Sequence, residues 1–187
     1  MEADWEFEIG GDAPVIEGRW PGLVDLRADP ASAARLAESL ELPALADALI
    51  KLNAANSPVW TSKADVFTPE SIDPDELDAV EGRSGSALAC YIDLLPRSDQ
   101  QGSLPFMAER YCRWICDRLH ELRLKCCRVD LVIRRAYIAP DMSDLGLTAY
   151  LTACGPNAAA AKAQLSECLA AFADVVACGR DDLRGAR

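Results

Sequence analysis

Residues 104–154 read LPFMAERYCRWICDRLHELRLKCCRVDLVIRRAYIAPDMSDLGLTAYLTAC, and this stretch decides the fold. Its first part places apolar residues at helical spacing and predicts a helix over about 105–122. The two parts that follow, Cys126–Ile138 and Leu145–Cys154, alternate apolar and polar residues and predict two strands. The connection at Pro140–Asp144 is short, so these strands should pair antiparallel.

The segments on either side extend this unit. Ala87–Leu95 predicts a strand before the helix, and Ala158–Val176 predicts a long helix after the last strand. The second half of the chain therefore reads β-α-β-β-α. This order resembles part of a ferredoxin-like layout, in which helices cover one face of an open sheet.

The first half predicts five elements that can add to the same sheet. In chain order they are strands over Trp5–Ile9 and Val15–Trp20, helices over about 30–40 and 43–53, and a strand over Val59–Phe67. Gly10-Gly11-Asp12 predicts a turn, so the first two strands should form a hairpin. Pro43 should separate the two helices, because proline disrupts a helix interior.

These elements predict one domain. A chain of 187 residues is long enough to bury a sizeable core. We expect an α+β domain over 1–178, with a mostly antiparallel open sheet and helices packed on one face. Its halves, about 1–68 and 86–178, are joined by an acidic loop over 69–85. Residues 179–187 should form a flexible charged tail.

Charge and hydropathy narrow the functional classes. The net charge of −11 argues against a nucleic-acid binder, because phosphate neutralisation needs clustered basic residues. No apolar run reaches the ~18–20 residues of a membrane span, and the first residues do not resemble a secretory signal. We therefore expect a cytoplasmic protein that does not bind membranes.

The charge is unevenly distributed along the chain. Residues 110–135 hold eight basic and three acidic side chains, a net charge of +5, so the rest of the chain carries −16. An acidic surface of this size can speed the encounter with a basic partner. It also contributes to solubility.

The cysteines offer a weak candidate metal site. Cys112, Cys116 and His120 are spaced i, i+4, i+8, which places them along one side of the predicted helix, and thiolates with an imidazole suit zinc. None of the eight cysteines forms the C-x2-C pair that is typical of zinc sites. Cys112 also belongs to the inward stripe of the helix. We expect reduced, mostly buried cysteines, with no metal or cofactor.

The better candidate is the face of the sheet that points away from the core. Strict alternation puts two arginines, two tyrosines and two acids on that side, namely Tyr91, Asp93, Arg128, Asp130, Arg134 and Tyr150. Arginine can grip a carboxylate or phosphate in a fork, and tyrosine adds a rigid contact surface. The face can be a solvated surface, a surface for a protein partner or homodimer, or a small-molecule or catalytic site.

The sequence favours binding over catalysis. It has no phosphate-binding loop, no dinucleotide fingerprint and no nucleophile elbow. Its only histidine, His120, lies on the helix and not on the polar face. We expect a non-catalytic interaction or accessory protein that engages a basic protein, as inhibitor and immunity proteins do, an analogy of charge and size. The alternative is a protein or enzyme that binds a small anion through the Arg/Asp/Tyr face. The open question is whether the acidic loop covers that face.

Overall fold

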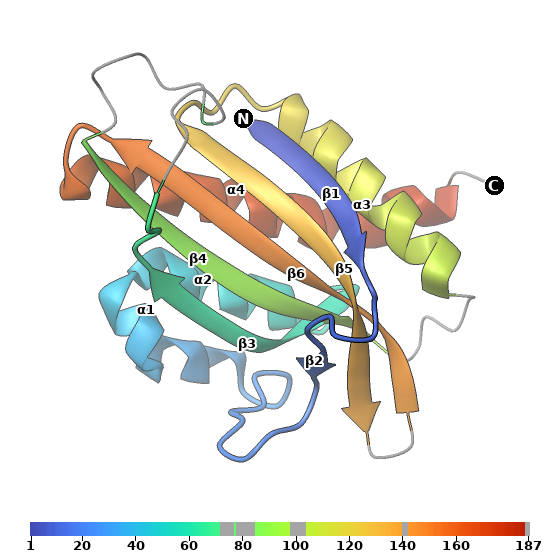
Figure 1. Ribbon diagram of the computed structural model, residues 1–187. Helices are drawn as coiled ribbons and strands as arrows, with labels where there is room; N and C mark the ends of the chain where they lie inside the picture. The colour runs from blue at the N-terminus through green and yellow to red at the C-terminus, as the bar shows by residue number, and fades with distance from the viewer. Residues whose placement is uncertain (72–76, 78–84, 98–103, 140–141, 186–187) are drawn as a thin grey trace.

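The fold is built on a six-stranded mixed sheet with the strand order β1-β5-β6-β4-β3, and β2 also pairs with β5 (Figure 1). The computed structural model describes residues 1–71, 77, 85–97, 104–139 and 142–185. The strands are β1 (Glu2–Glu8), β2 (Ile16–Glu17), β3 (Val59–Phe67), β4 (Ser86–Pro96), β5 (Cys127–Ala139) and β6 (Met142–Gly155). The helices are the 3-10 helix η1 (Pro30–Arg35), α1 (Ala37–Glu41), α2 (Pro43–Asn53), α3 (Leu104–His120) and α4 (Ala158–Gly185).

The centre of the sheet consists of β4, β6 and β5. Both pairings with β6 are antiparallel, so β4 and β5 run in the same direction with β6 between them. Helix α3 connects β4 to β5, which makes a split β-α-β unit. The predicted α+β class and the mostly antiparallel open sheet are confirmed. The closer comparison with a ferredoxin-like layout stays a prediction.

The predicted hairpin at the start of the chain is wrong. Strand β1 pairs in parallel with β5, from Glu2 opposite Arg128 to Glu8 opposite Arg134. The chain then loops out over residues 9–15 and returns as β2, which again pairs in parallel with β5. The glycine-containing segment therefore forms a loop that leaves the sheet and returns to the same strand, and it does not reverse the chain direction. Alternation in β1 shows which side is buried, but it does not identify the neighbouring strand.

Strand β3 has the bounds that its sequence indicates, and it forms the other edge of the sheet. Its pairing with β4 shifts between Thr61 and Ala64, so that Ser62 and Lys63 together face the single residue Asp93. This is a β-bulge, which reverses the alternation along the strand. As a result, Trp60 does not share the buried face of Val66.

The main core lies between the sheet and helices α2, α3 and α4, which pack on one side of it (Figure 1). Helix α4 contributes an apolar stripe that includes Leu165, Leu169 and Phe172, all fully buried. Six of the eight free cysteines are buried, in agreement with their predicted role as small apolar residues. Helix α4 extends to Gly185, beyond the end that its apolar stripe indicates. Among the described helices, none is long and apolar enough to span a membrane.

A second, smaller cluster lies on the opposite side of the sheet. Ile16, Trp60, Leu95 and Ala136 pack together there. Ile16 packs closely on Gly146, since a Cβ added at Gly146 would lie 2.8 Å from Cδ1 of Ile16. This contact holds β2 against the end of the β5–β6 hairpin. The side of the sheet opposite the helices is therefore covered at one end by the segment that follows β1.

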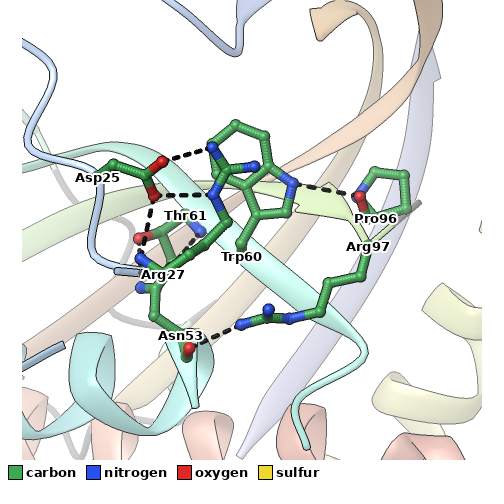
Figure 2. A network of polar contacts seen from close by, with 7 residues as sticks. All are labelled: Asp25, Arg27, Asn53, Trp60, Thr61, Pro96 and Arg97. Atoms are coloured by element: carbon green, nitrogen blue, oxygen red, sulfur yellow. Dashed lines mark hydrogen bonds and ion pairs between the residues drawn. The ribbon is translucent and has the colours of Figure 1, made fainter. Parts of the chain in front are cut away.

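A polar network fixes the junction of α2, β3 and the end of β4 (Figure 2). The buried Asn53 side chain donates to the Leu49 carbonyl (2.8 Å) and to Thr61 Oγ1 (2.7 Å), and its Oδ1 accepts the Thr61 N–H (3.1 Å). Nearby, the Arg97 guanidinium donates to the carbonyls of Asn53, Ala54 and Val59. The Trp60 indole N–H donates to Pro96 O at 3.2 Å, with the Arg27 guanidinium stacked on its ring.

Candidate functional site

The outer face is the side of the sheet that points away from the helices, and it brings the predicted polar residues together. The register places Asp130 opposite Tyr150, and Tyr150 opposite Tyr91. Asp93 lies opposite Thr148 in the next row. The residues that share this side are Tyr91, Asp93, Arg128, Asp130, Arg134, Thr148 and Tyr150. The alternation of the three central strands thus predicted the location of the cluster correctly.

Arg134 is the centre of a hydrogen-bond network on this face. Its Nε and Nη2 donate to Glu8 Oε2 at 2.8 and 2.6 Å. Its Nη1 donates to Thr148 Oγ1 and to the Tyr150 hydroxyl, both at 3.1 Å. Only 13% of the Arg134 side chain is exposed. All three guanidinium nitrogens are therefore engaged by oxygens of the protein itself.

Asp93 is a buried carboxylic acid at the inner end of the same network. The residue is 8% exposed, and its Oδ1 accepts a hydrogen bond of 2.6 Å from the Thr148 hydroxyl. Burial raises the pKa of Asp93, while the Thr148 hydrogen bond and the nearby charges of Arg134 and Lys63 act in the opposite direction. The contacts thus form one chain from Glu8 through Arg134 and Thr148 to Asp93.

The raised pKa of Asp93 predicts a pH dependence of stability. Its folded pKa lies above the ordinary value of 3.8, so the folded state binds the proton more tightly than the unfolded state. This contribution to stability is complete below 3.8 and is lost as pH rises through the folded pKa. We expect Asp93→Asn to remove this loss, because an amide does not titrate. Its oxygen can still accept the hydrogen bond from the Thr148 hydroxyl. Urea unfolding of both proteins between pH ~4 and ~7 measures the difference.

The exposed Asp47 provides the matched control for this experiment. Asp47→Asn changes the net charge equally and should leave the pH profile parallel to that of the wild type. The opposite result is that Asp93→Asn destabilises the protein more at neutral pH than below pH ~4. In that case the attraction between Asp93 and Arg134 outweighs the burial of the carboxylate.

Two tyrosines form an aromatic surface beside Arg134. The rings of Tyr91 and Tyr150 lie 6.1 Å apart between centroids, and the Arg134 guanidinium lies 5.6 Å from the Tyr150 ring. Burial raises the pKa of Tyr91, and the neighbouring carboxylates, Asp93 first among them, raise it further. Tyr91 therefore stays a neutral phenol at physiological pH and offers both a donor and an acceptor.

Acidic side chains line the margin of the outer face along β1. The parallel register puts Glu2, Asp4, Glu6 and Glu8 on the same side of the sheet as Arg128 and Arg134. The first three residues are exposed, and Glu8 is half-buried. Arg128 donates from Nε to both oxygens of Asp130, at 2.7 and 2.9 Å. Both arginines of the predicted site are therefore bonded to carboxylates, and the outermost charges are negative.

The sequence did not predict Glu8 as the partner of Arg134. The acidic residues of β1 alternate with Trp5 and Phe7. This pattern shows which side of the strand faces solvent, but not which strand lies next to it. The acidic loop over 69–85 lies mostly outside the described residues, so its predicted position is not tested. Of its central part only Leu77 is described, and that side chain is buried.

Comparisons with family models, curated proteins and solved structures find no match to this chain. The chemistry of the outer face is therefore the evidence on which a function rests. That chemistry combines a rigid, internally hydrogen-bonded centre with an exposed acidic margin. The central side chains are held in place by contacts within the protein, whereas the acidic margin faces solvent.

The three candidate metal ligands lie on α3, away from the outer face. Cys112 and Cys116 are buried, and burial raises the pKa of Cys116 to about 12 and that of Cys112 further. His120 is exposed, and its Nε2 accepts the Ala3 N–H at 3.3 Å. Among the described residues, no three metal-binding side chains are grouped closely enough to hold an ion. The two thiols contribute to the core instead.

Proposed function

We propose that this protein is a non-catalytic binding protein whose outer face engages a basic protein partner. The observation that carries the proposal is the row of exposed carboxylates on β1, Glu2, Asp4 and Glu6, beside arginines already neutralised by Glu8 and Asp130. The negative potential of this margin is thus not cancelled by the basic residues next to it. These carboxylates are part of the acidic excess that gives the chain its net charge of −11.

The geometry supports a basic partner for two reasons. A row of like charges at the rim of a surface steers an oppositely charged protein and raises its association rate. The tyrosine pair next to the row supplies a rigid amphipathic contact of the kind that is enriched at protein interfaces. The Arg134 network holds Glu8 and Tyr150 in fixed positions, so these two side chains lose little conformational entropy when a partner binds.

The two other candidate occupants receive less support. An anionic ligand needs donors, but every guanidinium nitrogen of Arg134 already donates to Glu8, Thr148 or Tyr150. A homodimer through the outer face would bring two acidic rows together, and like charges across an interface are unfavourable. Small-anion binding and dimerisation therefore remain alternatives to the proposal.

The test is a charge reversal on β1 with a matched control. Affinity capture from the native host at low salt supplies candidate basic partners, and their binding is then measured by titration calorimetry. We expect the double variant Asp4→Lys/Glu6→Lys to bind at least about tenfold more weakly, because it turns attraction into repulsion. The control Asp47→Lys/Glu167→Lys has the same net charge and alters the helix side, so its affinity should stay near that of the wild type.

Three results would count against the proposal. Equal weakening in both variants would mean that overall charge, and not the outer face, determines binding. A wild-type protein that captures no partner and stays monomeric would remove its main support. Binding that is insensitive to salt would also contradict it, because exposed charges are screened within about 8 Å at physiological ionic strength.

A further inference from the structure

A cavity of about 290 Å³ lies at the free edge of β3, on the opposite edge of the sheet from the acidic row of β1. Its apolar wall includes Leu36, Leu45 and Leu49, and Trp20 closes another side. Its polar lining residues include Glu38, Ser62, Lys63, Asp65 and Tyr91. The volume is close to the lower end of the range of about 300–1,000 Å³ that is typical of ligand pockets.

The cavity is built around the β-bulge. The bulge adds a residue at Ser62–Lys63, and Trp20 bridges to this point because its indole N–H donates to Ser62 O at 3.3 Å. The Lys63 ammonium lies 5.6 Å from the centroid of the Trp20 ring and 3.9 Å from the Glu17 carboxylate. Trp20 is therefore held in place by contacts with the edge strand, which fixes this side of the cavity.

One hydroxyl in the lining has no hydrogen-bond partner. Ser62 is 6% exposed, and its Oγ is buried without a partner among the described residues. Most buried polar side-chain atoms in proteins are paired, and an unpaired one destabilises the fold. Because Ser62 Oγ has almost no accessible surface, a molecule in the cavity does not reach it, and the polar groups that the cavity offers to a ligand are on other residues.

The charges at the cavity favour a cation. Lys63 has Glu17 as its ion-pair partner, whereas Glu38 and Asp65 have no ion-pair partner among the described residues. Asp65 accepts only the N–H of the adjacent Val66 in the described part of the chain. Two carboxylates thus lie at a cavity whose one lysine is already paired.

We infer that this cavity binds a small organic cation, an amine that carries an apolar body. The apolar body packs against the leucine wall and Trp20, which removes apolar surface from water. The ammonium group is attracted by the carboxylates of Glu38 and Asp65, which accept its N–H bonds. Charge-assisted hydrogen bonds of this kind are stronger than neutral ones. The site lies on different residues from the β1 row, but it shares Tyr91 with the tyrosine pair of the proposed partner surface.

Three probes that share a phenylethyl group test the choice of charge. They are 2-phenylethylamine, the neutral 2-phenylethanol and the anionic 3-phenylpropionate, each titrated into the isotope-labelled protein. The reporter is the Trp20 indole N–H resonance, which is assigned with the variant Trp20→Phe. We expect a saturable shift with the amine, and at least about tenfold weaker binding of the other two probes. Equal or tighter binding of 3-phenylpropionate, or no saturable shift with the amine, would overturn the inference.

Two variants locate the binding groups. Asp65→Asn should weaken amine binding, because it removes one of the two carboxylates that attract the ammonium group. Glu38→Gln should weaken the same binding, while Asp47→Asn, which removes an equal charge on the far side of α2, should not. Unchanged amine affinity in both Asp65→Asn and Glu38→Gln, or equal weakening in Asp47→Asn, would overturn the assignment of this cavity.

Discussion

Arg134→Ala is expected to lower the free energy of unfolding by about 3 kcal/mol or more. The substitution removes a largely buried guanidinium and leaves Glu8, Thr148 and the Tyr150 hydroxyl without their donor. It also removes the positive charge nearest to the buried Asp93. Removing one partner of a partly buried charge network costs more than the network adds, because Asp93 stays buried, although Glu8 is partly hydrated. The shift of the urea midpoint at constant m-value measures the effect.

Arg113→Ala is the matched control for this variant. Arg113 forms an i, i+4 ion pair with Glu109 on α3, but 63% of its side chain is exposed. Exposed pairs of this type contribute about 0.3–0.5 kcal/mol, so its midpoint should barely move. If Arg134→Ala were as mild as Arg113→Ala, the outer-face network would be a solvated surface, and its role as a rigid centre for binding would be lost.

Asn53→Ala is expected to destabilise the protein by a similar amount, about 3 kcal/mol. Asn53 is 1% exposed and makes three hydrogen bonds, to Leu49 O, to Thr61 Oγ1 and from the Thr61 N–H. Alanine leaves these groups buried, and each unpaired buried group costs about 1–3 kcal/mol, reduced where water reaches it. Thermal and urea unfolding should both register the loss.

The exposed Asn56, three residues further along, is the control for that variant. Asn56→Ala should stay within about 0.5 kcal/mol of the wild type, as surface substitutions usually do. Because Asn53 bonds to Thr61 just before the bulge, Asn53→Ala should also broaden the Trp20 indole resonance at the neighbouring Ser62. A destabilised variant with an unchanged Trp20 signal would show that the junction and the bulge are independent.

The sequence predicted the outer face because three central strands alternate for most of their length. In β5, Arg128, Asp130 and Arg134 share one side of the sheet. Side chains in the neighbouring strands alternate between the two faces with the same period of two. The prediction of the buried cysteines rests on the same reasoning, since their positions fall on apolar stripes. Such periodic patterns are local, so they can be read without knowing which strands are neighbours.

What the sequence did not predict depends on contacts between distant segments. Glu8 binds Arg134 only because β1 pairs with β5, and a Gly-Gly turn allows a hairpin as readily as a loop. The β-bulge beside Thr61 has no residue signature in this strand. The cavity at β3 brings together Trp20, Leu45 and Tyr91 from three separate segments of the chain. None of these arrangements follows from the period of a single segment.

The parallel pairing of β1 with β5 also has a consequence for folding. Strands β5 and β6 are joined directly, so their pairing closes a short loop, whereas the Glu8–Arg134 contact joins residues 126 positions apart. Loop-closure entropy makes such distant contacts late events on a folding pathway. We expect the central strands and their helices to assemble first and β1 to dock afterwards. The acidic row would then be displayed only by molecules that have completed folding, so a partner that reads it would discriminate against incomplete ones.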